Sequence, residues 1–302
     1  MEYELESILL TLENILKEVT PRKNLEGGLP ECDEYDYTEN YAAYCKIARE
    51  EIAEKDSYVS NILDKALESH IAKYSDATPF NICSIGCGAG EADRIMLENV
   101  SVPVNYVGIE INEKSSHMAK ATLKDLPLTQ VTIINEDFMQ MDLDSLSQFD
   151  LVLMVHVHYY IKDLKIMFGR LQKVAKENAK IVIISLNLTA KQKIWGVFFE
   201  KEWKFPCRYA QDLLQVLDEM GVRYSSEDLP NKGVWHLDKC FKEDFASQFS
   251  KNVLDFIYHT ALKNYPQEVS NLCVKYLRAC CRKTPESDLV FDYSINAIIL
   301  EN

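Results

Sequence analysis

The chain has 302 residues, with 33 Lys and Arg against 47 Asp and Glu, and its formal net charge is −14. This length is enough to bury the core of one large α/β domain, or of one domain with a substantial insertion. The acidic balance disfavours nucleic acid as a partner, because phosphate contacts need a basic surface, and it would attract a cationic small molecule.

The nine cysteines are spread without a disulfide-like framework, which favours reduced thiols inside a cell. No Cys-x-x-Cys pair is present, so no structural metal is expected. The segment Met1–Glu6 lacks the basic residues and apolar core of a signal peptide, and no apolar run approaches ~20 residues. We therefore expect a cytoplasmic protein with no membrane partner.

The first predicted element is an amphipathic helix. Apolar residues recur at i, i+3, i+4 and i+7 from Leu5 to Val19, and Thr20-Pro21 should end the helix. Its apolar face would serve packing or a dimer contact.

Tyrosines mark the second predicted helix, after a loop at residues 27–30. Tyr37, Tyr41 and Tyr44 recur on one face of this helix, with Glu50 and Glu51 near its end. A third helix is expected over residues 57–74 and leads into the first strand.

The stretch from Phe80 to Arg94 begins with an apolar run that stops at Gly86-x-Gly88-x-Gly90, and helix-forming residues follow at once. This pattern predicts a strand, a tight turn and a helix start. Glycine permits turn geometry and lets a ligand approach the main chain. The triplet alone is a weak signal for a cofactor loop.

A second signal follows about twenty residues later, where the short apolar strand Asn105–Glu110 ends in a carboxylate. An acid at this point can accept hydrogen bonds from the two hydroxyls of a ribose. Together the two signals predict a nucleoside cofactor.

The spacing of the glycines distinguishes between nucleoside cofactors. Dinucleotide folds use Gly-x-Gly-x-x-Gly facing a pyrophosphate, whereas here the glycines are followed by Glu91 and Asp93. These carboxylates would repel a pyrophosphate but suit the sulfonium and amino-acid tail of S-adenosylmethionine.

A third element, Val131–Phe138, resembles the class I methyltransferase strand whose terminal Asp137 and following Phe138 hold the adenine. The expected cofactor-binding residues are Gly86, Cys87, Gly88, Gly90, Glu91, Glu110, Ile111, Ser115, Asp137, Phe138 and Val155.

Strands are predicted near residues 80–85, 104–110, 130–135, 149–156 and 180–186, separated by helical patterns. Their continuous apolar runs indicate strands covered on both faces. We expect an α/β fold with a doubly wound, mostly parallel seven-stranded sheet of the Rossmann-like, class I methyltransferase type, with helical substrate-binding additions.

Beyond residue 187 the pattern changes. Helices are expected near residues 190–203 and 209–220, a strand near 222–228, and a mostly helical stretch over 236–282. A last strand follows at Leu289–Leu300. A long insertion before the final strand is a common way to build a substrate lid.

The segment Val155–Tyr160 follows the fourth strand, and the carboxyl ends of parallel strands face the ligand crevice. His156 and His158, two apart on an extended strand, would point the same way and could bind a metal, but no third ligand is identifiable. The other interpretations are a buried, hydrogen-bonded histidine without chemistry, or a substrate contact or proton acceptor at His156.

Several stretches are similar to histamine N-methyltransferases, over roughly residues 35–302. The glycine loop identifies only the superfamily, whereas the segment from Tyr159 to Asp163 and the last strand are more specific. The matching stretches are Ile82–Asp93, His158–Asp163, Phe205–Tyr209, Leu217–Gly221, Asp238–Phe241 and Phe291–Glu301.

The resemblance implies a substrate site. Tyr37 and Tyr41 match its aromatic wall, and Glu50 matches its amine-binding glutamate, with Glu51 one register away. The other expected substrate residues are Tyr44, His156, Tyr159, Tyr160, Trp195, Cys207, Phe256 and Tyr293.

This chain departs from that family at two substrate positions. His156 stands where the family has a polar amide, and Tyr293 stands where it has an asparagine. These departures favour another biogenic amine or an amino-acid derivative over histamine.

We therefore expect an S-adenosylmethionine-dependent N-methyltransferase of a small amine, monomeric or weakly dimeric. Glu50 would bind the ammonium and help remove its proton, with His156 as an alternative acceptor. Two alternatives stay open: a small-molecule O-methyltransferase with His156 as base, and a catalytically silent relative that binds partners through the first helix.

The expected organisation has four parts. Residues 1–75 form helices that contribute to the substrate site, and residues 76–230 form the cofactor-binding core. Residues 231–288 form a helical insertion or lid, and residues 289–302 supply the last strand of the core sheet.

Overall fold

The computed structural model describes residues 2–19, 37–50, 58–126, 130–146, 148–189, 192–203, 205–286 and 288–301. The chain forms two compact units. Unit 1 comprises Met1–Arg49, Asn187–Cys207 and Pro230–Ser294, and unit 2 comprises Glu50–Leu186, Arg208–Leu229 and Ile295–Asn302. The sequence analysis assigned a role to each of four parts of the chain, and that assignment stays a prediction.

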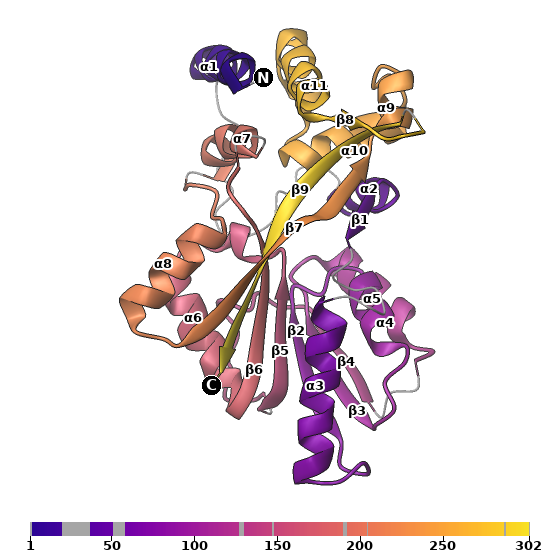
Figure 1. The fold of residues 1–302 in the computed structure, drawn as a ribbon, viewed down its shortest axis with the longest axis vertical. Coiled ribbons are helices and arrows are strands. Elements are labelled where there is room, and N and C mark those ends of the chain that lie inside the picture. The colour runs from indigo at the N-terminus through magenta and orange to yellow at the C-terminus, as the bar shows by residue number, and fades with distance from the viewer. Residues whose placement is uncertain are drawn as a thin grey trace. The chain divides into compact units, whose positions relative to one another are not determined.

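Unit 2 is built on a mostly parallel sheet (Figure 1). At its centre β2 (Phe80–Ile85) pairs in parallel with β3 (Val104–Ile109) on one side and with β5 (Phe149–Val155) on the other. The strand order therefore reverses between β2 and β5. In such sheets ligands bind outside the carboxyl ends of the strands at this switch point.

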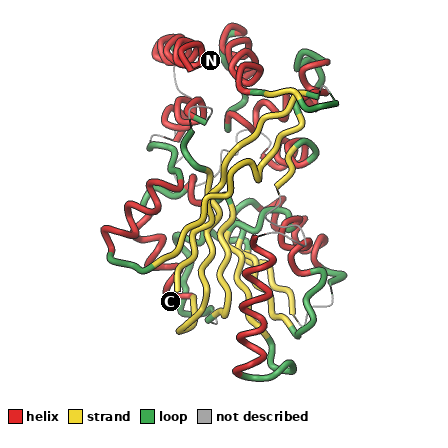
Figure 2. Tube along the Cα trace, in the orientation of Figure 1, coloured by secondary structure: helices red, strands yellow, loops and turns green. Residues whose placement is uncertain are grey.

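The remaining strands extend the sheet in both directions. β4 (Gln130–Ile134) and β6 (Ala175–Leu186) are parallel to β3 and β5, and β9 (Leu289–Glu301) is antiparallel to β6. This arrangement, with helices flanking the strands (Figure 2), confirms the predicted α/β fold.

The strand order across the described residues is β1-β7-β9-β6-β5-β2-β3-β4, where β7 is Tyr224–His236. Two short strands, β1 (Ala48–Glu50) and β8 (Arg282–Lys283), extend the sheet beyond the seven strands expected.

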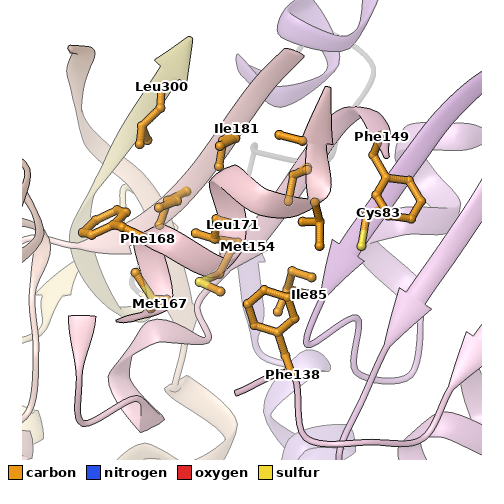
Figure 3. Close-up of a cluster of buried hydrophobic side chains, with 14 of the residues drawn as sticks. Cys83, Ile85, Phe138, Phe149, Met154, Met167, Phe168, Leu171, Ile181 and Leu300 are labelled. Atoms are coloured by element: carbon orange, nitrogen blue, oxygen red, sulfur yellow. The ribbon is translucent and has the colours of Figure 1, made fainter. Parts of the chain in front are cut away.

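The helix α6 (Leu164–Val174) shows how sequence periodicity builds the core of unit 2. Asp163 caps its first turn by accepting a hydrogen bond from the Ile166 N–H at 3.0 Å. Leu164, Phe168 and Leu171 are at most 5% exposed and pack with side chains from β2, β5 and β6 (Figure 3). Each such side chain stabilises the fold by about 1.5–3 kcal/mol.

The described residues of unit 2 form five further helices. They are α3 (Tyr58–Lys73), α4 (Glu91–Leu97), α5 (Glu113–Leu123), the 3₁₀ helix η1 (His158–Tyr160) and α8 (Ala210–Met220).

Unit 1 is mostly helical. Its first helix, α1 (Glu2–Glu18), packs on α7 and α11, with Leu5, Leu12 and Leu16 at most 3% exposed. The apolar face of α1 therefore serves packing, one of its two expected roles. The other helices are α2 (Tyr37–Cys45), α7 (Lys193–Trp203), α9 (Asp238–Lys242), α10 (Gln248–Tyr258), η2 (Leu262–Asn264) and α11 (Gln267–Cys280).

The prediction that Glu50 follows on the second helix is wrong. α2 ends at Cys45, and residues from Ala48 to Glu50 form strand β1. Ile47 is 4% exposed and its carbonyl accepts a hydrogen bond from the His236 N–H at 2.8 Å, so pairing with β7 overrides helix continuation. Glu51 and the side chain of Glu50 lie outside the described part of the chain.

None of the described helices combines the length and the apolar character that crossing a membrane requires.

Candidate active site

The turn between β2 and α4 depends on glycine. Gly86, Gly88 and Gly90 have φ angles of 65°, 56° and 82°, a left-handed region that glycine adopts at little cost. The Gly86 N–H donates to the Ile109 carbonyl at 2.7 Å, which ties the turn to the end of β3. A Cβ at Gly86 would lie 2.4 Å from Val157 Cγ2. The turn therefore packs directly on the segment that follows β5.

Glu110 follows β3 beside this turn and is 6% exposed. Its Oε2 accepts the Gly88 N–H at 2.9 Å, and its Oε1 accepts the Asn112 N–H at 2.8 Å. Burial raises the pKa of Glu110, and these backbone hydrogen bonds oppose the shift. An ionised carboxylate accepts hydrogen bonds at both of its oxygens, so Glu110 is suited to bind the two hydroxyls of a vicinal diol.

The residues after Glu110 are held in place by side-chain hydrogen bonds. Asn112 caps α5 by accepting the Ser115 N–H at 2.8 Å, and the Asn135 amide donates to the carbonyls of Glu110 and Ile111. Ile111 is 38% exposed, whereas Ser115 is buried. Ile111 can therefore offer an apolar surface to a ligand, while Ser115 supports the cap.

The acids after the glycine turn differ in environment. Glu91 is exposed, but Asp93 is buried, and burial raises the pKa of Asp93 to about 6 against an opposing hydrogen bond with Ser84. Cys87 also packs inward, since a Cβ on Gly108 would lie 2.7 Å from its Sγ.

Asp137 and Phe138 lie in a turn beyond the end of β4. The Asp137 carboxylate accepts the Met139 N–H and the Gln140 amide, each at 2.8 Å. Phe138 is 5% exposed and belongs to the core in Figure 3, where it lies beside Ile85. The Phe138 ring is therefore part of the hydrophobic core, whereas Asp137 is half-buried at the turn.

His156 is the first residue after β5 and has a φ of 56°, which is uncommon for a residue with a Cβ. Its N–H still donates to the Ile184 carbonyl at 3.0 Å. The imidazole Nδ1 lies 2.8 Å from Tyr159 Oη, and that oxygen also accepts the Leu186 N–H at 2.8 Å. A hydrogen-bonded chain therefore joins His156, Tyr159 and β6.

The expectation that His156 and His158 share an extended strand is wrong, because β5 ends at Val155 and His158 begins the helix η1. His158 is fully buried, with Nε2 3.0 Å from Ser185 Oγ. Burial lowers the pKa of His158 to about 3, and neighbouring His156 adds to the shift. His158 is therefore neutral at physiological pH.

Unit 1 gathers most of the expected aromatic substrate residues into one cluster. Tyr44 is its centre: its ring lies 4.4 Å from that of Phe256, and its hydroxyl accepts the Trp235 Nε1–H at 2.9 Å. We name this the aromatic cluster, and its members are Tyr37, Tyr41, Tyr44, Trp195, Trp235, Phe256, Phe291 and Tyr293.

The Tyr293 ring lies so close to the main chain of Gly233 that no other residue would fit at position 233. A Cβ on Gly233 would lie 2.1 Å from Tyr293 Cε2, and the Tyr293 hydroxyl lies 3.4 Å from that of Tyr44. The buried Trp195 Nε1 has no hydrogen-bond partner within the described residues. Cys207, which follows α7 in the sequence, is half-buried.

Trp235 and Asn112 are site residues that the sequence analysis missed. Trp235 contacts four other cluster members, and Gly233 in the same strand is the signal that could have drawn attention to it. Of the expected substrate residues, His156, Tyr159 and Tyr160 belong to unit 2, and those of the aromatic cluster belong to unit 1.

Comparison with known proteins identifies the family. A family model described as a methyltransferase domain matches residues 79–231, about half of the chain. Histamine N-methyltransferase of Bos taurus is 29% identical over 191 residues, which cover 57% of this chain and 65% of that protein. The enzyme of that name from Rattus norvegicus is 25% identical over 278 residues, which cover 80% and 88%.

A solved structure, the YcgJ protein of Bacillus subtilis, aligns with a TM-score of 0.52 at 9% identity. The alignment covers 78% of this chain and 97% of that chain, and it supports the fold alone. By its matching family model, this chain belongs to the methyltransferase domain family, as a class I methyltransferase similar in sequence to the histamine N-methyltransferases.

Proposed function

We propose that this chain is an S-adenosylmethionine-dependent N-methyltransferase that acts on a small amine. The carboxylate of Glu110 carries the proposal, because it lies at the carboxyl end of β3 beside the glycine turn and is held there by the N–H groups of Gly88 and Asn112. Membership of the methyltransferase domain family supports the reaction. The similarity to histamine N-methyltransferases supports the amine.

The residues around the turn fit this cofactor. Glu110 would bind the two ribose hydroxyls, and the half-exposed Ile111 and Asp137 would border the adenine. The main chain of the glycine turn would meet the amino-acid tail, with Glu91 nearby as an exposed acid. The segment from Gly86 to Asp93 has no basic side chain for a pyrophosphate.

The bound cofactor would supply a methyl group carried by a sulfonium. The amine nitrogen attacks the methyl carbon, so that a carbon–nitrogen bond forms while the carbon–sulfur bond breaks and the thioether leaves. The amine must present its lone pair and therefore lose a proton. The protein's own tasks are to orient the amine for in-line attack and to accept that proton.

The aromatic cluster of unit 1 supports recognition of a cation. A ring face attracts an ammonium by about 1–2 kcal/mol when both are desolvated, and the net charge of −14 would draw a cation to the protein. The resemblance to histamine N-methyltransferases supports Glu50 as the ammonium anchor.

The proposal also covers the compartment, the oligomeric state and the partners of the protein. Cys83, Cys87, Cys240 and Cys273 are free thiols, which agrees with a reducing compartment. We infer a cytoplasmic enzyme that works as a monomer or weak dimer and does not bind nucleic acid, since its surface charge opposes phosphate contacts.

A screen of amines and of their hydroxyl analogues with methyl-labelled cofactor tests this proposal. We expect label on the nitrogen of an amine. Glu50→Gln should lower kcat/KM about tenfold or more, because a charge-assisted hydrogen bond of about 1.5–3 kcal/mol becomes a neutral one, with cofactor affinity unchanged. Glu51→Gln is the neighbouring control. Label on hydroxyls alone, or full activity in both variants, would overturn the proposal.

A further inference from the structure

We propose that Arg170 is a positioning residue for the cofactor. Its guanidinium holds the turn at residues 137–141, beyond the end of β4, so that the Asp137 carboxylate can accept a hydrogen bond from the amino group of adenine. Arg170 thereby sets the preference of the site for adenine over other purines. This preference rests on the proposed function, because it takes Asp137 as an adenine contact. The hold of Arg170 on the turn is a property of the chain alone.

Arg170 lies on α6 and reaches two main-chain carbonyls of this turn. Its Nε donates to the Phe138 carbonyl at 2.7 Å, and its Nη2 donates to the Met141 carbonyl at 2.5 Å. The guanidinium carbon also lies 5.3 Å from the centroid of the Phe138 ring, a distance at which a ring attracts a cation. A charged donor makes stronger hydrogen bonds than a neutral one, and the planar guanidinium spans two acceptors at once. One side chain therefore holds the turn at two points.

The turn is closed around Asp137. The N–H groups of Gln140 and Met141 both donate to the Asp137 carbonyl at 2.9 Å. The Met139 N–H and the Gln140 amide donate to the Asp137 carboxylate, each at 2.8 Å. The direction of this carboxylate therefore depends on the path of the main chain through residues 138–141, and the two hydrogen bonds of Arg170 fix that path.

The segment before the turn is tied to the proposed ribose acceptor. The Asn135 amide donates to the carbonyls of Glu110 and Ile111, at 2.8 and 2.9 Å. Asn135 and Arg170 thus hold the chain on either side of Asp137, the first to the end of β3 and the second to α6. These contacts fix the separation of the two carboxylates, so a nucleoside whose ribose binds Glu110 meets Asp137 at a set place.

The consequence concerns the choice of base. The amino group of adenine donates to a carboxylate, whereas hypoxanthine has at that place a carbonyl, which only accepts and is repelled. Phe138 and Met141 are 5% and 8% exposed in the core of unit 2, so the fold does not depend on the guanidinium. Without Arg170, water replaces its donors at the two carbonyls, and the turn loosens. A looser Asp137 distinguishes less well between the two bases.

Amide hydrogen exchange of the full chain without ligand tests the hold on the turn. Arg170→Met loses both donors, and we expect the amides of residues 139–141 to exchange about tenfold faster or more. Arg170→Lys keeps the charge but cannot span both carbonyls, so it should show a smaller increase.

Lys173→Met is the matched control for this measurement. It removes a cation from the same helix, where Lys173 pairs with exposed Asp144 at 2.5 Å, and it should leave the exchange of residues 139–141 unchanged. No increase in Arg170→Met, or in Arg170→Lys if the first variant does not fold, would overturn the assignment.

Calorimetry with S-adenosylhomocysteine and S-inosylhomocysteine tests the choice of base. We expect the wild type and Lys173→Met to bind the adenosyl compound about tenfold more tightly or more. This ratio should fall several-fold in Arg170→Met and in Asp137→Asn, whereas a merely structural role of Arg170 would lower stability and leave the ratio unchanged. An unchanged ratio in Arg170→Met would defeat the role in base choice. If the wild type binds neither compound, the proposed function fails, and hydrogen exchange still decides whether Arg170 holds the turn.

Discussion

Asp93, buried beside the glycine turn, makes the stability of the fold depend on pH. Burial raises its pKa to about 6 from an ordinary value of 3.8. Because the folded-state pKa lies above the unfolded one, Asp93 contributes stability that is fully present below about pH 4. That contribution is lost as the pH rises through about 6.

The variant Asp93→Asn removes this titration. The free energy of unfolding of the wild type, relative to the variant, should fall by about 1–2 kcal/mol between roughly pH 5 and pH 8. Urea unfolding at both pH values measures the difference. Asp144→Asn is the control, because Lys173 lowers the pKa of exposed Asp144 and no loss of that sign is expected there. A difference that does not change with pH would contradict the account of Asp93.

At the scale of elements, the glycine turn joins the ends of β2, β3 and β5. Gly86 and Gly221 have nearly the same φ, 65° and 66°, so alanine meets similar backbone strain at both, about 1–2 kcal/mol. Only at Gly86 does the added Cβ collide with Val157, because nothing lies within 4 Å of a Cβ at Gly221.

The two alanine variants therefore separate strain from collision. Gly86→Ala should displace Val157 and His156 and weaken S-adenosylhomocysteine binding about tenfold, a cost within the range of about 1–3 kcal/mol for overpacking. Gly221→Ala should lose some thermal stability but keep its affinity within about twofold. Calorimetry with both variants measures this. Equal losses of affinity would show that the contact between the turn and Val157 does not matter.

The central strands were predictable because they are buried on both faces. β2, β3 and β5 end within about a residue of their predicted limits, as continuous apolar runs are typical of parallel strands. β7 runs on to His236, through Pro230 and Gly233, which read locally as turn residues. Pairing in the sheet overrides that local preference.

The geometry of the candidate site was predictable only where a motif lies at the end of a strand. The glycine turn and Glu110 follow directly from their spacing in the sequence. The hydrogen bond between His156 and Tyr159 depends on β5 ending at Val155 and on the turn of η1. The sequence pattern predicted a strand through residue 156, so it did not indicate this bond. The predicted position of Glu50 near the end of a helix is wrong, because residues Ala48–Glu50 form strand β1.

At the scale of the whole molecule, the proposed function requires that this chain bind S-adenosylmethionine through Glu110 at the carboxyl ends of the central strands. The charge, the fold and the family membership all agree with a methyl transfer enzyme. A binding measurement on Glu110 itself tests this requirement.

Calorimetric titration of the full chain with S-adenosylhomocysteine is that measurement. The wild type should bind, and Glu110→Ala should bind at least several-fold more weakly, because two ribose hydroxyls lose their acceptors at a cost of about 1–3 kcal/mol. Glu113→Ala, which removes an exposed acid from the first turn of α5, should bind like the wild type. No binding by the wild type, or equal affinity in Glu110→Ala, would contradict the account.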